Sequence, residues 1–234
     1  MFYDIFLPQA NESELANIAK EFNIKPIFLY NFKTKKEILK KKEELQKQGI
    51  SCYVGSYIKP NSAQDIKKGA KLWLASDFLA VIEPGQFIRQ AVSNPRIDAV
   101  FGVPNTFGRD YIEYRASNWN VVLTNIAKKS KVCYGIDFSQ ILKCSGFLRA
   151  KLIGREMQNI RLCRGKIPIL IASLANEPWQ IRWPTDLAAF GRILGLNAPQ
   201  SKAAVSTLYK FIIRRKEERR SPTFIMPGVK LIEQ

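Results

Sequence analysis

The chain has 234 residues and no histidine, an absence that removes several kinds of active site at once. A Ser-His-Asp triad and a cysteine nucleophile activated by a histidine base are both excluded. A zinc site is disfavoured as well, because the four cysteines lie far apart with no Cys-x-x-Cys pair. We expect them to be reduced and mostly buried thiols: Cys52, Cys133, Cys144 and Cys163.

The sequence also lacks the signals of membrane insertion, secretion and nucleotide binding. Its longest apolar runs have the length of strands and are too short to span a bilayer. The first residues, Met1 to Ile5, do not form a basic region followed by an apolar core, as a secretory signal would. The glycines fit neither a Gly-x4-Gly-Lys-Ser/Thr loop nor a Gly-x-Gly-x-x-Gly turn after a strand. We therefore expect a cytoplasmic protein that itself binds no cofactor and no membrane.

Acidic residues are few, since 20 Asp and Glu stand against 37 Lys and Arg, and the formal net charge is +17. A surplus of this size on a globular domain indicates a polyanionic partner, and nucleic acid is the commonest one because its phosphates attract such cations. The alternative is a lysine-rich surface that serves solubility.

Short apolar runs alternate with amphipathic segments from the first residues onward, a pattern typical of parallel strands joined by helices. We predict an α/β fold: a TIM-barrel-like single domain of about seven or eight parallel strands with surrounding helices over residues 1–220, then an extended tail over 221–234. An open doubly wound sheet is the alternative. The strands are expected over 2–7, 26–30, 51–58, 77–83, 99–103, 131–138 and 167–172. The helices are expected over about 12–22, 35–48, 86–92, 118–129, 139–164 with a break near Gly146, 184–194 and 201–218.

The clearest βα unit lies between Ile167 and Leu196. An apolar run, strand-sized and buried on both faces, is followed by a polar loop of small residues over 173–178. A helix then begins with Pro184 in its first turn and ends at Gly195, as prolines and glycines favour.

The same unit carries a family resemblance. Residues 172–191, ASLANEPWQIRWPTDLAAFG, resemble the Ser-Ser-Gly-Ala and Leu-Arg-Ser-Pro-Arg-Asp-Leu-Ala segments of ribonuclease P protein component 3, the archaeal relative of the eukaryotic thirty-kilodalton ribonuclease P subunit. Residues 96–100 resemble the family's Arg-Val-Asp-Ile-Leu strand, and residues 224–230 resemble its Arg-Pro-Gly-Val-Lys ending. The similarity extends loosely along nearly the whole chain and departs at Trp183, where the family has a serine cap.

The resemblance implies a protein subunit of the ribonucleoprotein that removes 5′ leaders from precursor tRNA. In that family the catalyst is RNA and Mg²⁺ is held through the RNA, so we expect no catalytic residue and no metal ligand in this protein, which alone would not be an endonuclease. The implied partners are ribonuclease P RNA, precursor tRNA, protein component 2 in a heterotetramer, and other ribonuclease P proteins. Lys and Arg would screen the phosphates and so lower the Mg²⁺ that the folded RNA needs.

Arginines are the preferred candidates for RNA contact, because the guanidinium group binds phosphate oxygens in a bidentate manner. Two interpretations of Arg182 and Asp186 stay open: an ion pair within the helix, or a carboxylate that orients the guanidinium toward a phosphate. Trp179 and Trp183 are candidates for stacking on an unpaired base, for a partner contact or for core packing. The predicted RNA-binding residues are Arg89, Arg96, Arg149, Arg155, Arg182, Asp186, Arg192, Lys202, Arg214 and Arg215.

A different function also fits part of the pattern. Glu83, Asp137 and Glu177 follow predicted strands, where a barrel places its active site, and three such carboxylates could hold Mg²⁺ through water. The alternative hypothesis is therefore a metal-dependent barrel hydrolase or phosphoesterase acting on an anionic substrate. The missing histidines weigh against it, and the same carboxylates could cap helices or pair with arginines.

Overall fold

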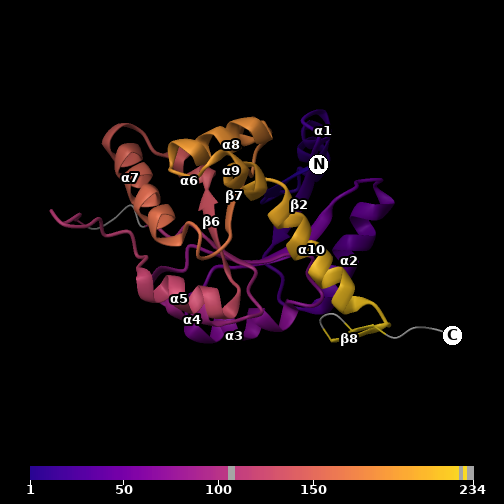
Figure 1. Ribbon diagram of the computed structural model, residues 1–234. Helices are drawn as coiled ribbons and strands as arrows, with labels where there is room; N and C mark the ends of the chain where they lie inside the picture. Colours follow the sequence, from indigo (N-terminus) through magenta and orange to yellow (C-terminus); the bar gives the residue numbers. More distant parts are fainter. Residues whose placement is uncertain (105–108, 227–228, 231–234) are drawn as a thin grey trace.

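The computed structural model describes residues 1–104, 109–226 and 229–230 (Figure 1). Within these residues, seven parallel strands form one sheet in which each strand pairs with the next along the chain. Because both faces of this sheet are covered, the strands are nearly continuous apolar runs. The strands are β1 (Phe2–Phe6), β2 (Ile24–Tyr30), β3 (Tyr53–Ile58), β4 (Leu79–Ile82), β5 (Ala99–Phe101), β6 (Cys133–Asp137) and β7 (Ile169–Ala172).

The first and last strands approach each other, so the sheet is a nearly closed barrel. A parallel bridge joins Phe6 to Ala175, and the amide of Leu7 donates to the Ala175 carbonyl at 2.8 Å. At the same seam, Asp4 accepts a hydrogen bond of 2.7 Å from the amide of Ser173. The TIM-barrel-like prediction is confirmed, and the sheet is not the open doubly wound alternative.

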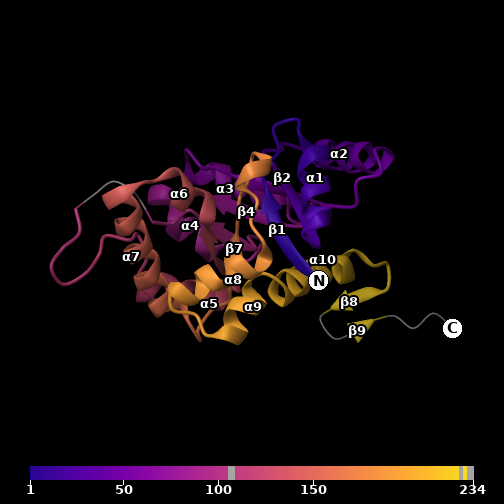
Figure 2. The ribbon, with the colours of Figure 1, turned by 90° about the horizontal axis from the view of Figure 1, so that it is seen from above.

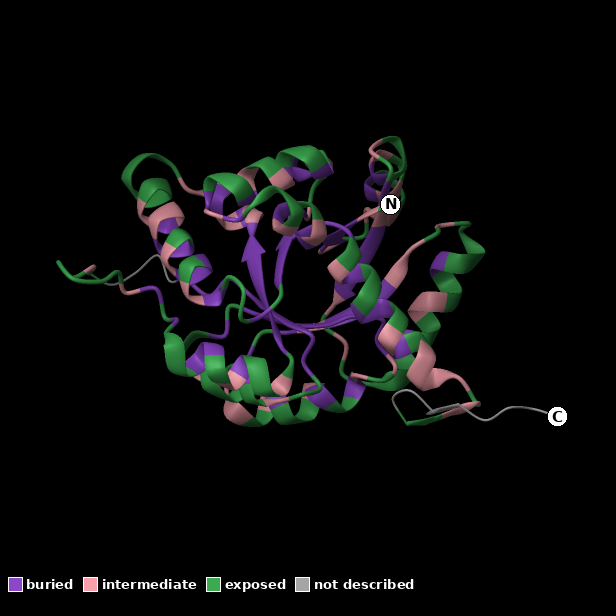
Figure 3. Cartoon of the chain, in the orientation of Figure 1, coloured by how far each residue is buried: buried purple, intermediate pink, exposed green. Residues whose placement is uncertain are grey.

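Helices surround the barrel, with their buried faces toward the strands and their exposed faces outward (Figures 2 and 3). No helix among the described residues has the length and apolar character to cross a membrane. Short 3-10 helices lie at Ala70–Leu72, Gly85–Phe87 and Pro178–Gln180. The α-helices are α1 (Glu12–Glu21), α2 (Lys35–Lys47), α3 (Ala63–Gly69), α4 (Ile88–Ser93), α5 (Val121–Ser130), α6 (Phe138–Lys143), α7 (Gly146–Cys163), α8 (Pro184–Ile193), α9 (Ala198–Ala204) and α10 (Thr207–Arg220).

Three details differ from the sequence-based expectations. The helix α3 was not expected, and the single long helix expected over 201–218 is instead the two helices α9 and α10. Within the segment 221–234, expected to be an extended tail, residues 224–230 include a small antiparallel pair, β8 (Phe224–Met226) with β9 (Val229–Lys230), and residues 227–228 and 231–234 lie outside the described residues. The break near Gly146 is where expected, between α6 and α7.

The helix α10 closes the amino-terminal end of the barrel. Its buried residues Tyr209, Ile212 and Ile213 join the cluster of apolar side chains that fills the interior. The Tyr209 ring lies 6.3 Å from that of Tyr3, and its hydroxyl donates to the carbonyl of Ile171 at 2.9 Å. Higher in the barrel, Gly135 makes room for the ring of Phe101, because a Cβ there would lie 2.3 Å from a ring carbon. The interior is therefore a packed core.

Candidate nucleic-acid interface

Two predicted RNA-binding residues lie together on the helix pair α8–α9. Arg192 in the last turn of α8 and Lys202 on α9 are both exposed, and the two helices pack against each other. Arg164, at the end of α7, donates to the carbonyl of Gly195 in the turn between them at 2.6 Å. This bond connects α7 to the helix pair α8–α9, so Arg164, Arg192 and Lys202 lie on the same side of the barrel.

Arg182 is half-buried and turned toward its own loop. Its Nη1 donates to the carbonyls of Trp179 at 2.7 Å and Ile181 at 2.9 Å, which fixes the guanidinium just before α8. Asp186 is exposed in the first turn of α8, where its charge complements the helix dipole. In the described part of the chain, no ion pair or hydrogen bond links its carboxylate to Arg182. The main chain therefore positions Arg182.

The two tryptophans of this loop differ in environment. Trp183, just before α8, stacks on Phe22, just after α1, with ring centroids 4.2 Å apart, while half of it stays exposed. Trp179 is 63% exposed, and its indole N–H donates to the carboxylate of Glu177. Trp179 remains available for stacking on a base or a partner.

Arg89 and Arg96 are exposed on and just after α4. Figure 1 shows α3, α4 and α5 along one side of the barrel, and α8 and α9 along the opposite side. The predicted residues therefore do not converge on one patch. Arg149 is also exposed, and its Nε donates to the carbonyls of Ile141 at 3.1 Å and Cys144 at 2.7 Å, which caps the end of α6.

Arg155 has no exposed surface, and this corrects its prediction as a surface contact with RNA. Its Nε and Nη2 donate to Oδ1 of Asp110 at 2.9 and 2.7 Å. From α7, Gln158 also binds the main chain of Arg115 at both its N–H and its carbonyl. Arg155 thus holds the long connection between β5 and α5 against α7.

The basic residues of α10 also have structural partners. Arg215 Nη2 lies 3.3 Å from Oδ1 of Asp98, and buried Lys216 pairs with Oδ2 of the same residue. Asp98 further accepts the amide of Leu79 at 2.7 Å. Arg214 is exposed and pairs with Glu218 at 3.1 Å. Asp98, in the segment that resembles the family's Arg-Val-Asp-Ile-Leu strand, therefore fixes α10 across the barrel end.

A second group of ion pairs surrounds Asp77 at the same end. Its Oδ1 lies 2.7 Å from Lys42 of α2 and 2.5 Å from Arg220 of α10. Burial alone would raise the pKa of Asp77, but Lys42 and Arg220 outweigh it and lower the pKa below its ordinary value. The sequence offered no sign of this pairing, because each residue looks like an ordinary surface charge.

The three carboxylates of the hydrolase hypothesis each have a local partner. Glu83 pairs with Lys59 at 2.6 Å, and Glu177 accepts from Trp179. Asp137 caps α6 by accepting from the amide of Gln140 at 3.2 Å, and it also accepts from the Ser139 hydroxyl at 2.7 Å. Burial raises its pKa to about 6. Among the described residues, no three His, Cys, Asp or Glu side chains are grouped so that they could hold a metal ion. The contacts of these three carboxylates are those of an ion pair, a tryptophan hydrogen bond and a helix cap.

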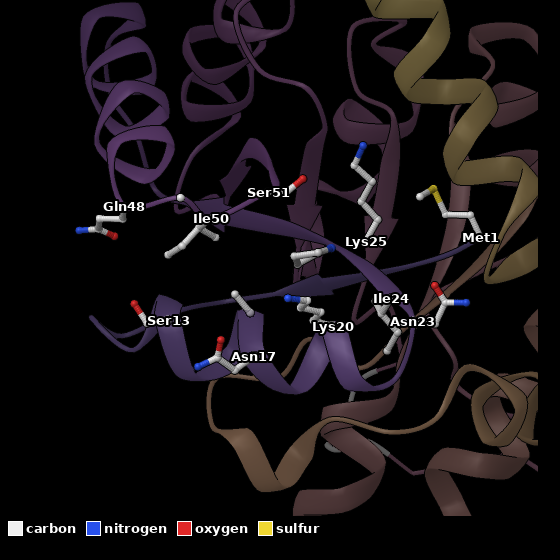
Figure 4. Close-up of a pocket in the computed structure, with 13 residues that line it drawn as sticks. Met1, Ser13, Asn17, Lys20, Asn23, Ile24, Lys25, Gln48, Ile50 and Ser51 are labelled. Atoms are coloured by element: carbon white, nitrogen blue, oxygen red, sulfur yellow. The ribbon is translucent and has the colours of Figure 1, made fainter.

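An open cleft of about 490 Å³ lies between α1, the start of β2 and the turn from α2 to β3 (Figure 4). Ser13, Asn17 and Lys20 of α1 line it together with Lys25 and Gln48, and the part of its lining that the structure describes contains no carboxylate. Such a wall of amides and lysines could accept the sugar-phosphate backbone of RNA. No local sequence pattern marks this cleft, because its residues come from three separate elements.

The amino-acid sequence of this chain is similar to those of several known proteins. A family described as RNase P subunit p30 matches residues 1–221. Ribonuclease P protein component 3 of Methanosarcina mazei is 29% identical over 146 residues, which is 62% of this chain and 57% of that protein. The same component of Methanococcus vannielii is 24% identical over 80% of this chain and 79% of that protein. The mouse ribonuclease P protein subunit p30 is 32% identical over 36% of this chain and 31% of that protein.

The fold has a close match among solved structures. A chain in a cryo-EM structure of archaeal ribonuclease P with mature tRNA aligns with a TM-score of 0.79 and 19% identity, over 99% of this chain and 98% of that one. At this identity the match shows the shared barrel. The family match, by contrast, covers all seven strands and every α-helix described above. The chain belongs to the RNase P subunit p30 family.

Proposed function

We propose that this chain is a protein subunit of ribonuclease P, which supports the catalytic RNA in removing 5′ leaders from precursor tRNA. The family match over residues 1–221 carries the proposal, and the net charge of +17 agrees with a polyanionic partner. The matched stretch spans just over half of several relatives, 57% of the protein from M. mazei, so the shared activity is part of the proposal.

The protein would act through charge and shape. Cations on a rigid barrel neutralise phosphates that would otherwise repel each other, and so stabilise the active fold of the RNA at lower Mg²⁺. The RNA would hold the Mg²⁺, and the protein would act in the cytoplasm without a cofactor. The residues proposed to contact RNA are exposed or half-buried and form no ion pair found among the described residues, unlike Arg214 and Arg215: Arg89, Arg96, Arg149, Arg182, Arg192 and Lys202.

The proposed assembly contains ribonuclease P RNA, precursor tRNA, other ribonuclease P proteins and protein component 2, the last in a heterotetramer with this chain. Cations on opposite sides of the barrel, on α4 and on α8–α9, suit a subunit that bridges two parts of a large particle. An isolated barrel that bound one RNA helix would need cations on one side.

Cleavage of precursor tRNA at limiting Mg²⁺ tests the proposal. The reactions to compare are this protein alone, the cognate RNA alone, and the RNA with this protein and component 2. Cleavage in the complete mixture is the expected result. Cleavage by the protein alone would instead make its carboxylates catalytic, and no stimulation in the complete mixture would contradict the proposed role.

A further inference from the structure

A pocket of about 240 Å³ lies beside α10 at the amino-terminal end of the barrel. Its walls are mainly apolar, formed by Ile167 and Pro168 just before β7 and by Leu208 and Ile212 on α10. Phe211, also on α10, stands at the pocket with 65% of its surface exposed. An exposed aromatic ring next to an apolar pocket is characteristic of a contact surface. We call this feature the α10 pocket.

Positive charge surrounds the α10 pocket without compensation. Lys128 and Lys131 at the end of α5 and Lys166 before β7 line it and are exposed, and no Asp or Glu is among the described residues that line it. None of the three lysines takes part in an ion pair found among the described residues. A fourth cation, Arg215, is turned toward Asp98 at 3.3 Å. The free charge therefore belongs to the three lysines.

We propose that the α10 pocket binds an acidic segment of a protein partner. One apolar side chain of the segment fills the pocket and packs against Phe211, while Asp or Glu residues on either side pair with Lys128, Lys131 and Lys166. Desolvated apolar anchors supply most of the affinity in such contacts, and complementary charge supplies selectivity.

The chemistry of the walls favours a peptide over RNA. A nucleobase placed in the pocket would lose the hydrogen bonds that its edges make with water, since Ile167, Pro168, Leu208 and Ile212 offer no polar side-chain group. Phosphates alone would need only the lysines and would leave the apolar cavity unused. The pocket is also distinct from the α4 and α8–α9 residues of the proposed RNA contacts.

Peptide titration of the full-length chain tests the inference. The probe is a fluorescent dodecapeptide of Asp and Glu with one central Leu, compared with the same peptide carrying Ser and with dodecauridylate. The Leu peptide should bind about tenfold more tightly than the Ser peptide, which is what burial of one Leu side chain provides. Binding of the Leu peptide should also shift the methyl resonances of Ile167 and Ile212 in NMR spectra of the protein. Equal affinity for both peptides, or equal shifts with the oligonucleotide, would overturn the inference.

Matched variants distinguish peptide binding at the α10 pocket from attraction to the overall positive charge of the protein. Lys128→Glu/Lys131→Glu/Lys166→Glu should weaken Leu-peptide binding at least about tenfold. The control makes the same charge change on exposed lysines of α2: Lys35→Glu/Lys36→Glu/Lys40→Glu. Equal losses in both variants would contradict a specific site. Precursor-tRNA cleavage with the pocket variant separately reports on the proposed function, because the two activities depend on different residues.

Discussion

Two regions of the barrel surround their buried carboxylates with partners of opposite kinds. At the amino-terminal end, Asp98 and Asp77 are paired with cations of α10 and α2. Between β6 and α7, buried Glu156 has a neutral partner instead: it accepts a hydrogen bond of 2.7 Å from the hydroxyl of Tyr134. Cations keep a buried acid ionised, whereas a neutral partner lets it take up a proton. The unfolding free energy contributed by the two regions should therefore change with pH in opposite directions.

The ionic contacts at the two ends of the barrel also differ in how much they stabilise the fold. Ionic contacts at the amino-terminal end hold α10 in place, so these charges serve stability. At the carboxyl-terminal end, Glu83 and Lys59 form an exposed pair, which contributes little to stability. The usual place of a barrel active site thus has no concentration of paired, buried charge among the described residues.

The largest effect is expected from Asp98→Ala. This change leaves Lys216, which is fully buried, without its carboxylate, and an unpaired buried cation costs about 3–5 kcal/mol of unfolding free energy. Urea unfolding at neutral pH measures the loss. The control is Glu218→Ala, which breaks the exposed pair with Arg214 and should change the free energy by less than about 1 kcal/mol. Similar losses in the two variants would show that burial of the Asp98 pair is not decisive.

Glu156→Gln should remove a destabilisation that appears at high pH. Burial raises the pKa of Glu156 to about 8, and nearby Asp137 adds to the rise. Because the folded-state pKa lies above the unfolded one, the stabilisation is complete below about pH 4 and is lost as the pH rises through about 8. Urea unfolding between about pH 6 and pH 9 should show the wild-type free energy falling by a few kcal/mol and the variant changing less. Parallel curves would rule out Glu156 as the titrating group.

The seam residue Asp4 provides a second case of the same kind. Burial raises its pKa to about 7, so its contribution should be lost at lower pH than that of Glu156. Asp4 also accepts from the amides of Ile5 and Ser173, which Asn can retain through its side-chain carbonyl. Asp4→Asn is therefore the matched variant that separates the two titrations.

Asp77→Asn should show the opposite pH dependence. The pKa of Asp77 is lowered in the folded state, so its stabilisation is present above the unfolded pKa of about 4 and is lost as the pH falls through the folded pKa. We expect the variant to lose about 1–2 kcal/mol at pH 7 and to approach the wild type under acid conditions. Unfolding free energies of the wild type and the variant, at pH 7 and under acid conditions, measure this. A difference between the two proteins that stays the same at both would exclude the ion pairs of Asp77 as the cause.

Much of the fold could be predicted because the strands are apolar runs separated by capped or amphipathic helices. The apolar pattern does not reveal α3, whose sequence AQDIKKG supplies a single buried apolar side chain, Ile66. That helix is fixed instead by a capping box between Ser62 and Asp65. The break between α9 and α10 was likewise invisible, because apolar residues continue through Val205 and only the path of the chain onto the barrel end separates the helices.

The candidate site could be predicted only as a charge surplus. Arg155 and Arg192 are both arginines of predicted helices, yet the first is buried and the second exposed. The partner of Arg155, Asp110, lies 45 residues away, and the partner of Arg215, Asp98, lies 117 residues away. No local periodicity reports such distant pairing, because it depends on how the barrel brings the segments together.

The smallest effect is expected from a pair of arginine variants that separates stability from RNA contact. Arg182→Ala removes a guanidinium whose hydrogen bonds, among the described residues, go to the main-chain carbonyls of its own loop, so the unfolding free energy should change little. If Arg182 contacts a phosphate, RNA affinity should fall less than about tenfold, and the dependence of log affinity on log salt should lose about one unit of slope. Arg215→Ala should have the reverse effect, a lower stability and an unchanged salt slope, because its guanidinium is paired with Asp98.

Titration of ribonuclease P RNA at several salt concentrations, with urea unfolding in parallel, measures both quantities. An unchanged slope for Arg182→Ala would remove that residue from the interface, whereas a lower slope for Arg215→Ala would mean that the charges holding α10 also reach the RNA.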